Sequence, residues 1–160
     1  MNRVFLRAED VPLPSWARAA ESFVRKVLET LGRKNPALRN QEVSILFCSN
    51  RYIKSLNAQY RNRDEPTDVL SFPLGGTEGH GKRSGPKLAG DIVVSLDALE
   101  ENTRFFKVSP DEELRRLLIH GVLHLFGSDH GTNKPEEPML KTQEEILSCL
   151  AGERIQENVP

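Results

Sequence analysis

The chain has 160 residues, of which 38% are hydrophobic and 28% are charged, as in an ordinary soluble globular protein. Its 22 lysines and arginines nearly balance 23 aspartates and glutamates, which gives a formal net charge of −1. This balance excludes a uniformly basic coat protein for nucleic acid, but it leaves room for a local basic groove, because binding depends on where the charges lie.

The first elements predicted are a short strand and a long helix. The apolar run at 3–6 is typical of a strand. In segment 15–32 apolar residues recur at helical spacing, with Ser15 as the expected N-cap and Gly32 as the expected end. At about 100–200 residues per domain, a chain of this length predicts a single domain that spans residues 1–160.

Three further strands are predicted in the middle of the chain. Runs rich in β-branched and aromatic residues lie at 42–49, 68–74 and 90–96. Asn50 follows the first of these runs and is expected to cap a helix. Between the last two, the Gly-rich polar segment 75–89 predicts a long mobile loop.

The last part of the chain predicts three helices. One covers 96–106, a second is capped by Ser109 and runs to Phe126 with Gly127 as its end, and a third covers 138–151. Strands and helices thus intermix, which indicates a sheet covered by helices in an α/β or α+β fold.

Cellular location is suggested by two features of the sequence. Two cysteines about a hundred residues apart cannot make a disulfide framework, which favours a reducing compartment. Charged residues interrupt the N-terminal segment, so it lacks a signal-peptide apolar region, and no apolar run of about 20 residues is present to span a bilayer. We therefore expect a cytoplasmic protein without a membrane partner.

The segment HGVLHLFGSDH contains three of the four histidines. His120 and His124 are four residues apart inside 117–127, a stretch without charge, so they project from one face of a buried helix. Unpartnered imidazoles in a dry interior cost a few kcal/mol each, roughly, and a shared divalent metal removes that cost. Because Gly127 permits a sharp turn, His130 can return as a third ligand. Three ligands leave a fourth position for water, as in a catalytic zinc site.

The same histidine spacing occurs in the HExxHxxGxxH signature of metalloproteases, but Gly121 stands where those enzymes carry their glutamate base. The pattern therefore predicts a metalloprotease-like zinc-binding helix without the base for peptide cleavage. Asp129 can orient a ligand, accept a proton, or simply form the turn at the helix end.

A group of basic residues, Arg51, Lys54, Arg61 and Arg63, surrounds the predicted end of the second helix. Arginine can grip a phosphate through two parallel hydrogen bonds and stabilise charge in a transition state, although taken alone such residues are more often a solvated face. Lys82, Arg83 and Lys87 can likewise guide an RNA backbone or be simply solvated. His80 is not expected to bind the metal.

Three stretches, YRNRDEPTDVLSFP, GDIVVS and HGVLHLFGSDH, together resemble the YbeY family of bacterial rRNA maturation factors, described as single-strand-specific endoribonucleases. The resemblance extends over essentially the whole chain. Ser128 replaces an aromatic residue common in the family, which changes neither a histidine nor the spacing.

The resemblance implies an α+β fold with a small mixed β-sheet packed with helices, and one Zn²⁺ per chain held by His120, His124 and His130. It also implies Arg61 as a functional residue. Implied partners are precursor rRNA and single-stranded RNA, the small ribosomal subunit and assembly factors, with roles in 16S rRNA 3′-end maturation and ribosome quality control. No DNA partner is expected.

The expected mechanism uses a zinc-bound water with a pKa near ~7, or a phosphate polarised by zinc, with Arg61 offsetting charge on the phosphate. Two alternatives stay open. One is a ribosome assembly factor whose zinc has no catalytic role, and the other, disfavoured by Gly121, is a metalloprotease.

Overall fold

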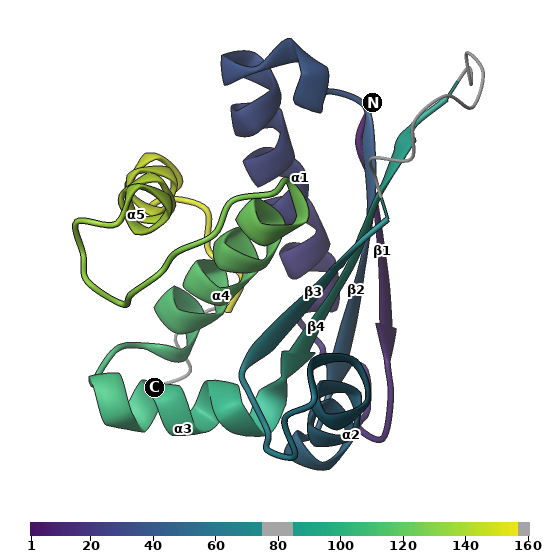
Figure 1. The fold of residues 1–160 in the computed structure, drawn as a ribbon. Coiled ribbons are helices and arrows are strands. Elements are labelled where there is room, and N and C mark those ends of the chain that lie inside the picture. Colours follow the sequence, from purple (N-terminus) through teal and green to yellow (C-terminus); the bar gives the residue numbers. More distant parts are fainter. Residues whose placement is uncertain (75–84, 157–160) are drawn as a thin grey trace.

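A computed structural model describes residues 1–74 and 85–156 (Figure 1). The elements follow one another along the chain as β1 (Arg3–Ala8), α1 (Ala17–Lys34), a 3-10 turn (Pro36–Leu38), β2 (Gln41–Cys48), α2 (Asn50–Arg61), β3 (Val69–Pro73), β4 (Lys87–Ser95), α3 (Leu96–Phe106), α4 (Pro110–Leu125) and α5 (Pro138–Cys149).

The four strands form one mixed sheet in the order β1-β2-β4-β3, which confirms the predicted α+β class. The pairs β1–β2 and β2–β4 are parallel, whereas β3 runs antiparallel to β4 at the edge. On one face, α1 and α4 pack on the sheet, and α5 packs on α4 (Figure 1). On the other face, α2 covers a smaller cluster that contains Leu46, Ile53 and Val93. The helix that carries the histidines therefore lies between the sheet and α5.

Close approach of α4 to the sheet depends on Gly121. A Cβ atom at this position would lie 2.8 Å from Cγ2 of Ile92, a β4 residue with no solvent exposure. The hydroxyl of Ser71 on β3 donates to the carbonyl oxygen of Gly121 at 2.8 Å. Gly121 thus faces the sheet, and the helix contacts both β3 and β4 where it lacks a side chain.

The predicted limits of the first helix were wrong at both ends. Trp16 rather than Ser15 takes the N-cap position of α1, without a side-chain hydrogen bond, and its ring packs edge-on against Phe47. Gly32 does not end the helix, which continues to Lys34. The absent side chain of Gly32 instead leaves space for Arg39, whose Nε donates to the Gly32 carbonyl at 2.9 Å.

Two predictions in the middle of the chain also need correction. Ser49, not Asn50, caps α2 by accepting from the backbone N–H of Tyr52. The predicted mobile loop 75–89 is too long, because β4 already begins at Lys87 and pairs there with β2. Gly90, the first residue of the predicted strand 90–96, has a φ of +141° next to a register shift inside the observed strand. Residues 75–84 of that prediction lie outside the described residues.

The remaining elements agree with the predictions. Strands occupy most of 42–49, 68–74 and 90–96, and α3 covers the predicted 96–106. Ser109 caps α4 by accepting from the backbone N–H of Glu112 at 3.1 Å. Within residues 1–74 and 85–156, no helix is both long and apolar enough to cross a membrane.

Candidate metal centre

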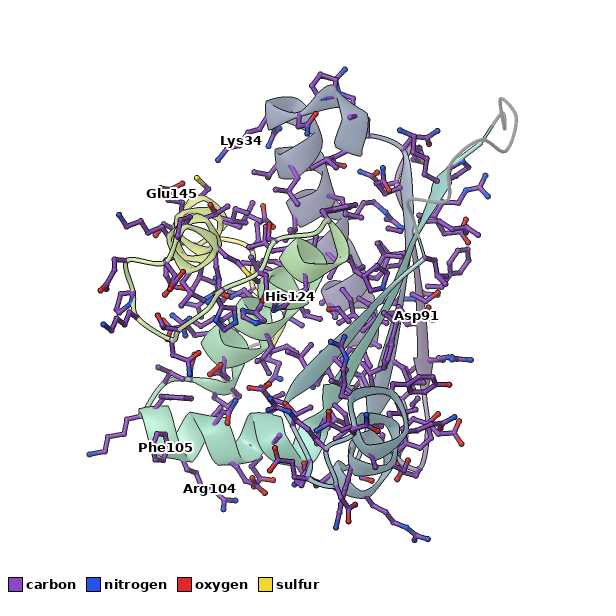
Figure 2. The ribbon with its side chains drawn as sticks, in the orientation of Figure 1. Lys34, Asp91, Arg104, Phe105, His124 and Glu145 are labelled. Atoms are coloured by element: carbon purple, nitrogen blue, oxygen red, sulfur yellow. The ribbon has the colours of Figure 1, made fainter. Side chains whose placement is uncertain are left out.

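The three predicted histidines come together at the end of α4. His120 and His124 project from the helix, and His130 reaches them from the segment that follows; Figure 2 places His124 on α4. One nitrogen from each ring lies within 4.8 Å of the others. Gly127, with a φ of +87°, adopts a conformation that favours glycine and turns the chain after the helix. The predicted role of this glycine is confirmed.

In each ring the Nδ1 atom faces an oxygen of the protein. These contacts are His120 Nδ1 with Gln143 Oε1 at 2.6 Å, His124 Nδ1 with Ser128 O at 2.9 Å and His130 Nδ1 with Thr132 O at 2.9 Å. Because a carbonyl or amide oxygen accepts, each Nδ1 carries the proton and donates, which leaves a lone pair on Nε2. Outer hydrogen bonds of this kind fix the tautomer and orientation of metal-ligating histidines.

The Nε2 atoms of His120 and His124 lie only 3.0 Å apart. With both Nδ1 atoms protonated, neither Nε2 has a hydrogen to offer, so two lone pairs face each other. A cation between them turns this repulsion into attraction. The donor set of three imidazoles suits a borderline divalent ion such as Zn²⁺ and leaves a coordination position open.

Electrostatics keep the two helix histidines neutral, as metal ligands must be. Burial lowers the pKa of His120 and outweighs the hydrogen bond that the ring donates to Gln143, which raises it. Burial likewise lowers the pKa of His124, with a smaller contribution from neighbouring His120. The site is therefore ready to bind a cation near neutral pH.

Asp129 takes the turn-forming role among those its position allowed. Its Oδ1 accepts from the backbone N–H of His130 at 2.8 Å, which tightens the turn that carries this histidine. The carboxylate also contributes to the electrostatic environment of His124.

Arg61 is the last residue of α2 and lines a cavity of about 730 Å³ together with His124 and Asp129. Its Nη2 donates to the carbonyl oxygen of Ser71 at 2.9 Å, and its Cζ lies 6.0 Å from the centre of the Phe72 ring. Because a guanidinium has five N–H donors, this anchoring leaves others for a ligand. One cavity thus contains the predicted arginine and one predicted metal ligand.

The other basic residues singled out in the sequence contribute less to the site. Arg63 lines the same cavity as Arg61, but Arg51 and Lys54 are exposed elsewhere on α2. Lys87 lies in β4 and donates to the carbonyl of Ala37, so it lines neither cavity beside the histidines. Lys82, Arg83 and His80 lie outside the described residues.

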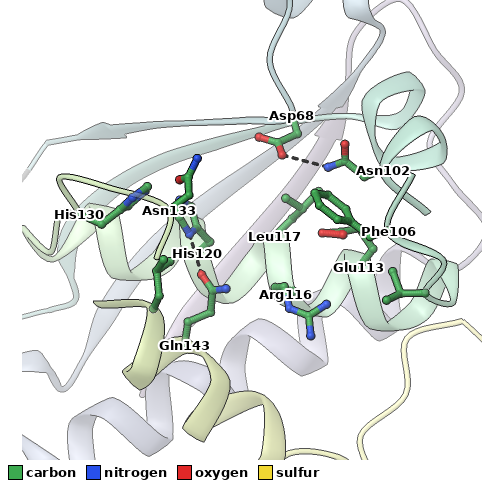
Figure 3. A pocket seen from close by; sticks show the side chains of 12 residues that line it. Asp68, Asn102, Phe106, Glu113, Arg116, Leu117, His120, His130, Asn133 and Gln143 are labelled. Atoms are coloured by element: carbon green, nitrogen blue, oxygen red, sulfur yellow. Dashed lines mark hydrogen bonds between the residues drawn. The ribbon is translucent and has the colours of Figure 1, made fainter. Parts of the chain in front are cut away.

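Two candidate functional residues were not identified from the sequence. Gln143, 6% exposed on α5, orients His120, and Glu113, 4% exposed on α4, lines a second cavity of about 380 Å³ beside His120 and His130 (Figure 3). Glu113 precedes His120 by seven residues, two helical turns, which places both on one face. Gln143 is a polar residue within the apolar stripe of α5, and this was its only signal.

The fold and the site together place the chain in a class of α+β proteins that carry a cluster of three histidines at the end of a buried helix. The chain belongs to the endoribonuclease YbeY family, whose model matches residues 8–151, and the resemblance seen in the sequence is thereby confirmed.

Named relatives and one solved structure support this membership. The endoribonuclease YbeY of Treponema denticola is 48% identical over 127 residues, which is 79% of each chain. That of Treponema pallidum (strain Nichols) is 40% identical over 148 residues, covering 92% of this chain and 89% of the relative. The solution structure of TM1509 from Thermotoga maritima superposes with a TM-score of 0.60 at 28% identity, covering 98% of this chain and 97% of that one.

Proposed function

We propose that the protein is a metal-dependent endoribonuclease that cuts single-stranded RNA. His120, His124 and His130 hold one Zn²⁺, and Arg61 stabilises the negative charge that develops on the phosphate. The observation that carries this proposal is the convergence of three imidazoles, one nitrogen of each lying within 4.8 Å of the others, whose Nδ1 atoms all contact an oxygen of the protein. Family membership supplies the substrate class, because the relatives are named endoribonucleases.

When bound, the cation supplies Lewis-acid chemistry and hydroxide near neutral pH without a carboxylate base. The residues of the chain provide the rest. The three imidazoles orient the centre, while the N–H groups of Arg61 that Ser71 leaves free donate to the phosphate oxygens. Because Arg61 and His124 line one cavity, a phosphate held by Arg61 lies in the same cavity as this proposed metal ligand.

Precursor rRNA is the proposed natural substrate, with the small ribosomal subunit and its assembly factors as partners and 16S rRNA 3′-end maturation and ribosome quality control as the processes served. This part of the proposal is supported by the sequence resemblance to rRNA maturation factors. A cytoplasmic location agrees with such a substrate and with two cysteines that are free thiols.

The test is cleavage of single-stranded RNA by purified protein, with a duplex of the same sequence and casein as alternative substrates. We expect cleavage of the single strand only, loss with a chelator and recovery with Zn²⁺. Arg61→Ala and His124→Ala, checked for folding by circular dichroism, should lose the activity. Arg104→Ala is the matched control, because Arg104 is exposed on α3 and, among the residues that the structure describes, pairs only with Glu100 one turn away.

Each alternative function has its own outcome in this experiment. Casein cleavage would establish a protease, which the structure disfavours because Ile92 occupies the space that a side chain at Gly121 would need. A folded, zinc-loaded wild type that cuts no RNA would establish a non-catalytic assembly factor. Undiminished cleavage in both site variants would reveal a contaminating nuclease.

A further inference from the structure

The cavity on the α3 side of the histidines has a chemical character of its own. Its walls come from α3, α4, α5 and the segments next to β3 and α5, and it has a volume of about 380 Å³, within the usual range for small-ligand pockets. His120 and His130 line it, so it adjoins the candidate metal centre (Figure 3), whereas the cavity of Arg61 is lined by the third histidine, His124. Phe106, Leu117 and Leu140 give it apolar walls.

Glu113 is the residue of this cavity that indicates a bound ligand. The residue is 96% buried, yet its carboxyl group makes no hydrogen bond or ion pair with the other described residues. Burying an unpartnered carboxyl is costly, and burial raises its pKa to about 7. Its face toward the cavity leaves it available to accept from a group that enters there.

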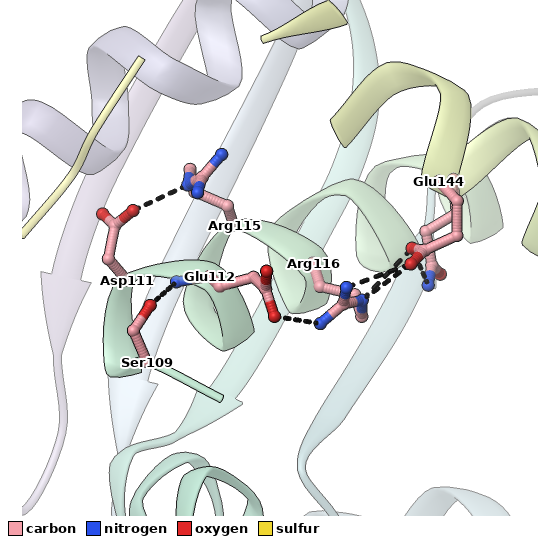
Figure 4. Close-up of polar contacts among 7 residues, drawn as sticks. Ser109, Asp111, Glu112, Arg115, Arg116 and Glu144 are labelled. Carbon is pink, nitrogen blue, oxygen red and sulfur yellow. Dashed lines mark hydrogen bonds and ion pairs between the residues drawn. The ribbon is translucent and has the colours of Figure 1, made fainter. Parts of the chain in front are cut away.

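The positive charge nearest to Glu113 is already neutralised by other groups. Arg116 lines the cavity, but its guanidinium pairs with Glu112 at 3.3 Å and with Glu144 at 3.0 Å (Figure 4). A second carboxylate, that of Asp68, accepts from Asn102 at 3.0 Å at the cavity wall. The polar lining therefore presents two carboxyl groups and favours a ligand that is rich in N–H donors.

We propose that this cavity binds an unstacked nucleobase next to the cleaved phosphate and prefers bases with an amino group on their Watson–Crick edge. The proposal rests on the RNA-cleaving function proposed above. Single-stranded RNA is typically recognised by splaying out a base, stacking it on an aromatic ring and pairing its edge with side chains. Here the half-exposed ring of Phe106 supplies the stacking surface, and Glu113 and Asp68 supply acceptors.

Base discrimination follows from the chemistry of the acceptors. Adenine, cytosine and guanine each offer an amino group that a carboxyl oxygen accepts, whether the carboxyl is ionised or protonated. Uracil presents two carbonyl oxygens on either side of a single N–H. These oxygens are themselves acceptors, so they cannot pair with the carboxyl oxygens of the cavity. A single well-made pair of this kind separates bases by at least about fivefold.

The binding test titrates the ¹⁵N-labelled, zinc-loaded chain with adenosine, cytidine or uridine and follows the side-chain amides of Asn102, Asn133 and Gln143 by NMR. These nucleosides lack phosphate, so they report on the base alone. Adenosine and cytidine should shift the amides and bind at least about fivefold more tightly than uridine. Glu113→Leu should abolish this preference and Glu113→Gln weaken it, whereas Glu145→Gln, on the exposed side of α5, should behave as the wild type.

The cleavage test uses a single-stranded RNA of random sequence, whose products are sequenced to give base frequencies on both sides of the cut. Depletion of uracil at one flanking position is expected for the wild type, and the products that Glu113→Leu still makes should lack this depletion whatever their total yield. Equal binding of all nucleosides, or no binding, would overturn the pocket even if RNA is cut. Selective nucleoside binding without RNA cleavage would retain the pocket and overturn the nuclease. Amide shifts with N-acetyl-arginine amide but not with nucleosides would assign the cavity to a protein partner and overturn the proposal.

Discussion

Replacing Gly121 by alanine tests whether this glycine sets the distance between α4 and the sheet. Helix propensity alone predicts stabilisation by about 1 kcal/mol, because alanine is the better helix former. The new Cβ, however, would lie 2.8 Å from Cγ2 and 3.4 Å from Cδ1 of fully buried Ile92. Overpacking of a tight core costs about 1–3 kcal/mol, so the net expectation is that the gain is cancelled or exceeded, with destabilisation of up to about 2 kcal/mol.

The assay is urea unfolding of the metal-free protein, because a metal bound to the folded state would itself increase the free energy of unfolding. Gly32→Ala is the matched control: it lies inside α1, and the atom nearest its added Cβ is Cγ of Arg39 at 3.0 Å, in an exposed side chain that is hydrogen-bonded to the Gly32 carbonyl. That variant should lose less stability than Gly121→Ala, because the neighbour that must shift is exposed and not buried. Ile92→Ala removes the methyl group that the new Cβ would meet. The double variant Gly121→Ala/Ile92→Ala should therefore lose less stability than the sum of the losses of the two single variants. A Gly121→Ala protein more stable than the wild type by the full helix-propensity gain of about 1 kcal/mol would refute the close-packing role.

Three further predictions concern the site. Gln143→Leu should weaken zinc binding by about 10–100-fold, measured by competition with a chelator, because His120 loses the partner that orients it; unchanged affinity would contradict that role. Arg61→Ala should lower kcat by about 10²–10³-fold, with partial recovery in Arg61→Lys, and a change confined to KM would argue for binding alone. The raised pKa of Glu113, about 7 against 4.5, makes the wild type lose stability relative to Glu113→Gln as pH rises from about 4.5 to about 7. The loss should total about 3 kcal/mol at most and can be measured by urea unfolding of both proteins at a series of pH values. A difference in unfolding free energy that does not change with pH would contradict this prediction.

The candidate site was predictable in its core because its residues are close in sequence. His120, His124 and His130 fall on one helix face and the turn beyond it, so their spacing alone brings them together. Arg61 was identified from a different stretch of the chain through the family resemblance, and the structure brings it to the same cavity as His124.

What the sequence could not supply depends on packing between distant elements. Gln143 meets His120 only because α5 packs on α4, and nothing in the local pattern of α5 specifies that contact. Gly32 misled for a related reason. It suggested a helix end, but it lies inside α1, where Arg39 from beyond the helix comes close.

Gly121 shows how one helix meets two demands at once. The histidine spacing suggested a lost catalytic glutamate, yet in this fold that position faces β4 and has no room for a side chain. Close packing at Gly121 holds α4 against the sheet. His120 and His124, on another side of the same helix, line the two cavities. A protease-type base at this position would require α4 to move away from Ile92, and the ligand His120, one residue earlier, would move with it. The absence of the carboxylate therefore follows from the packing that positions the three histidines.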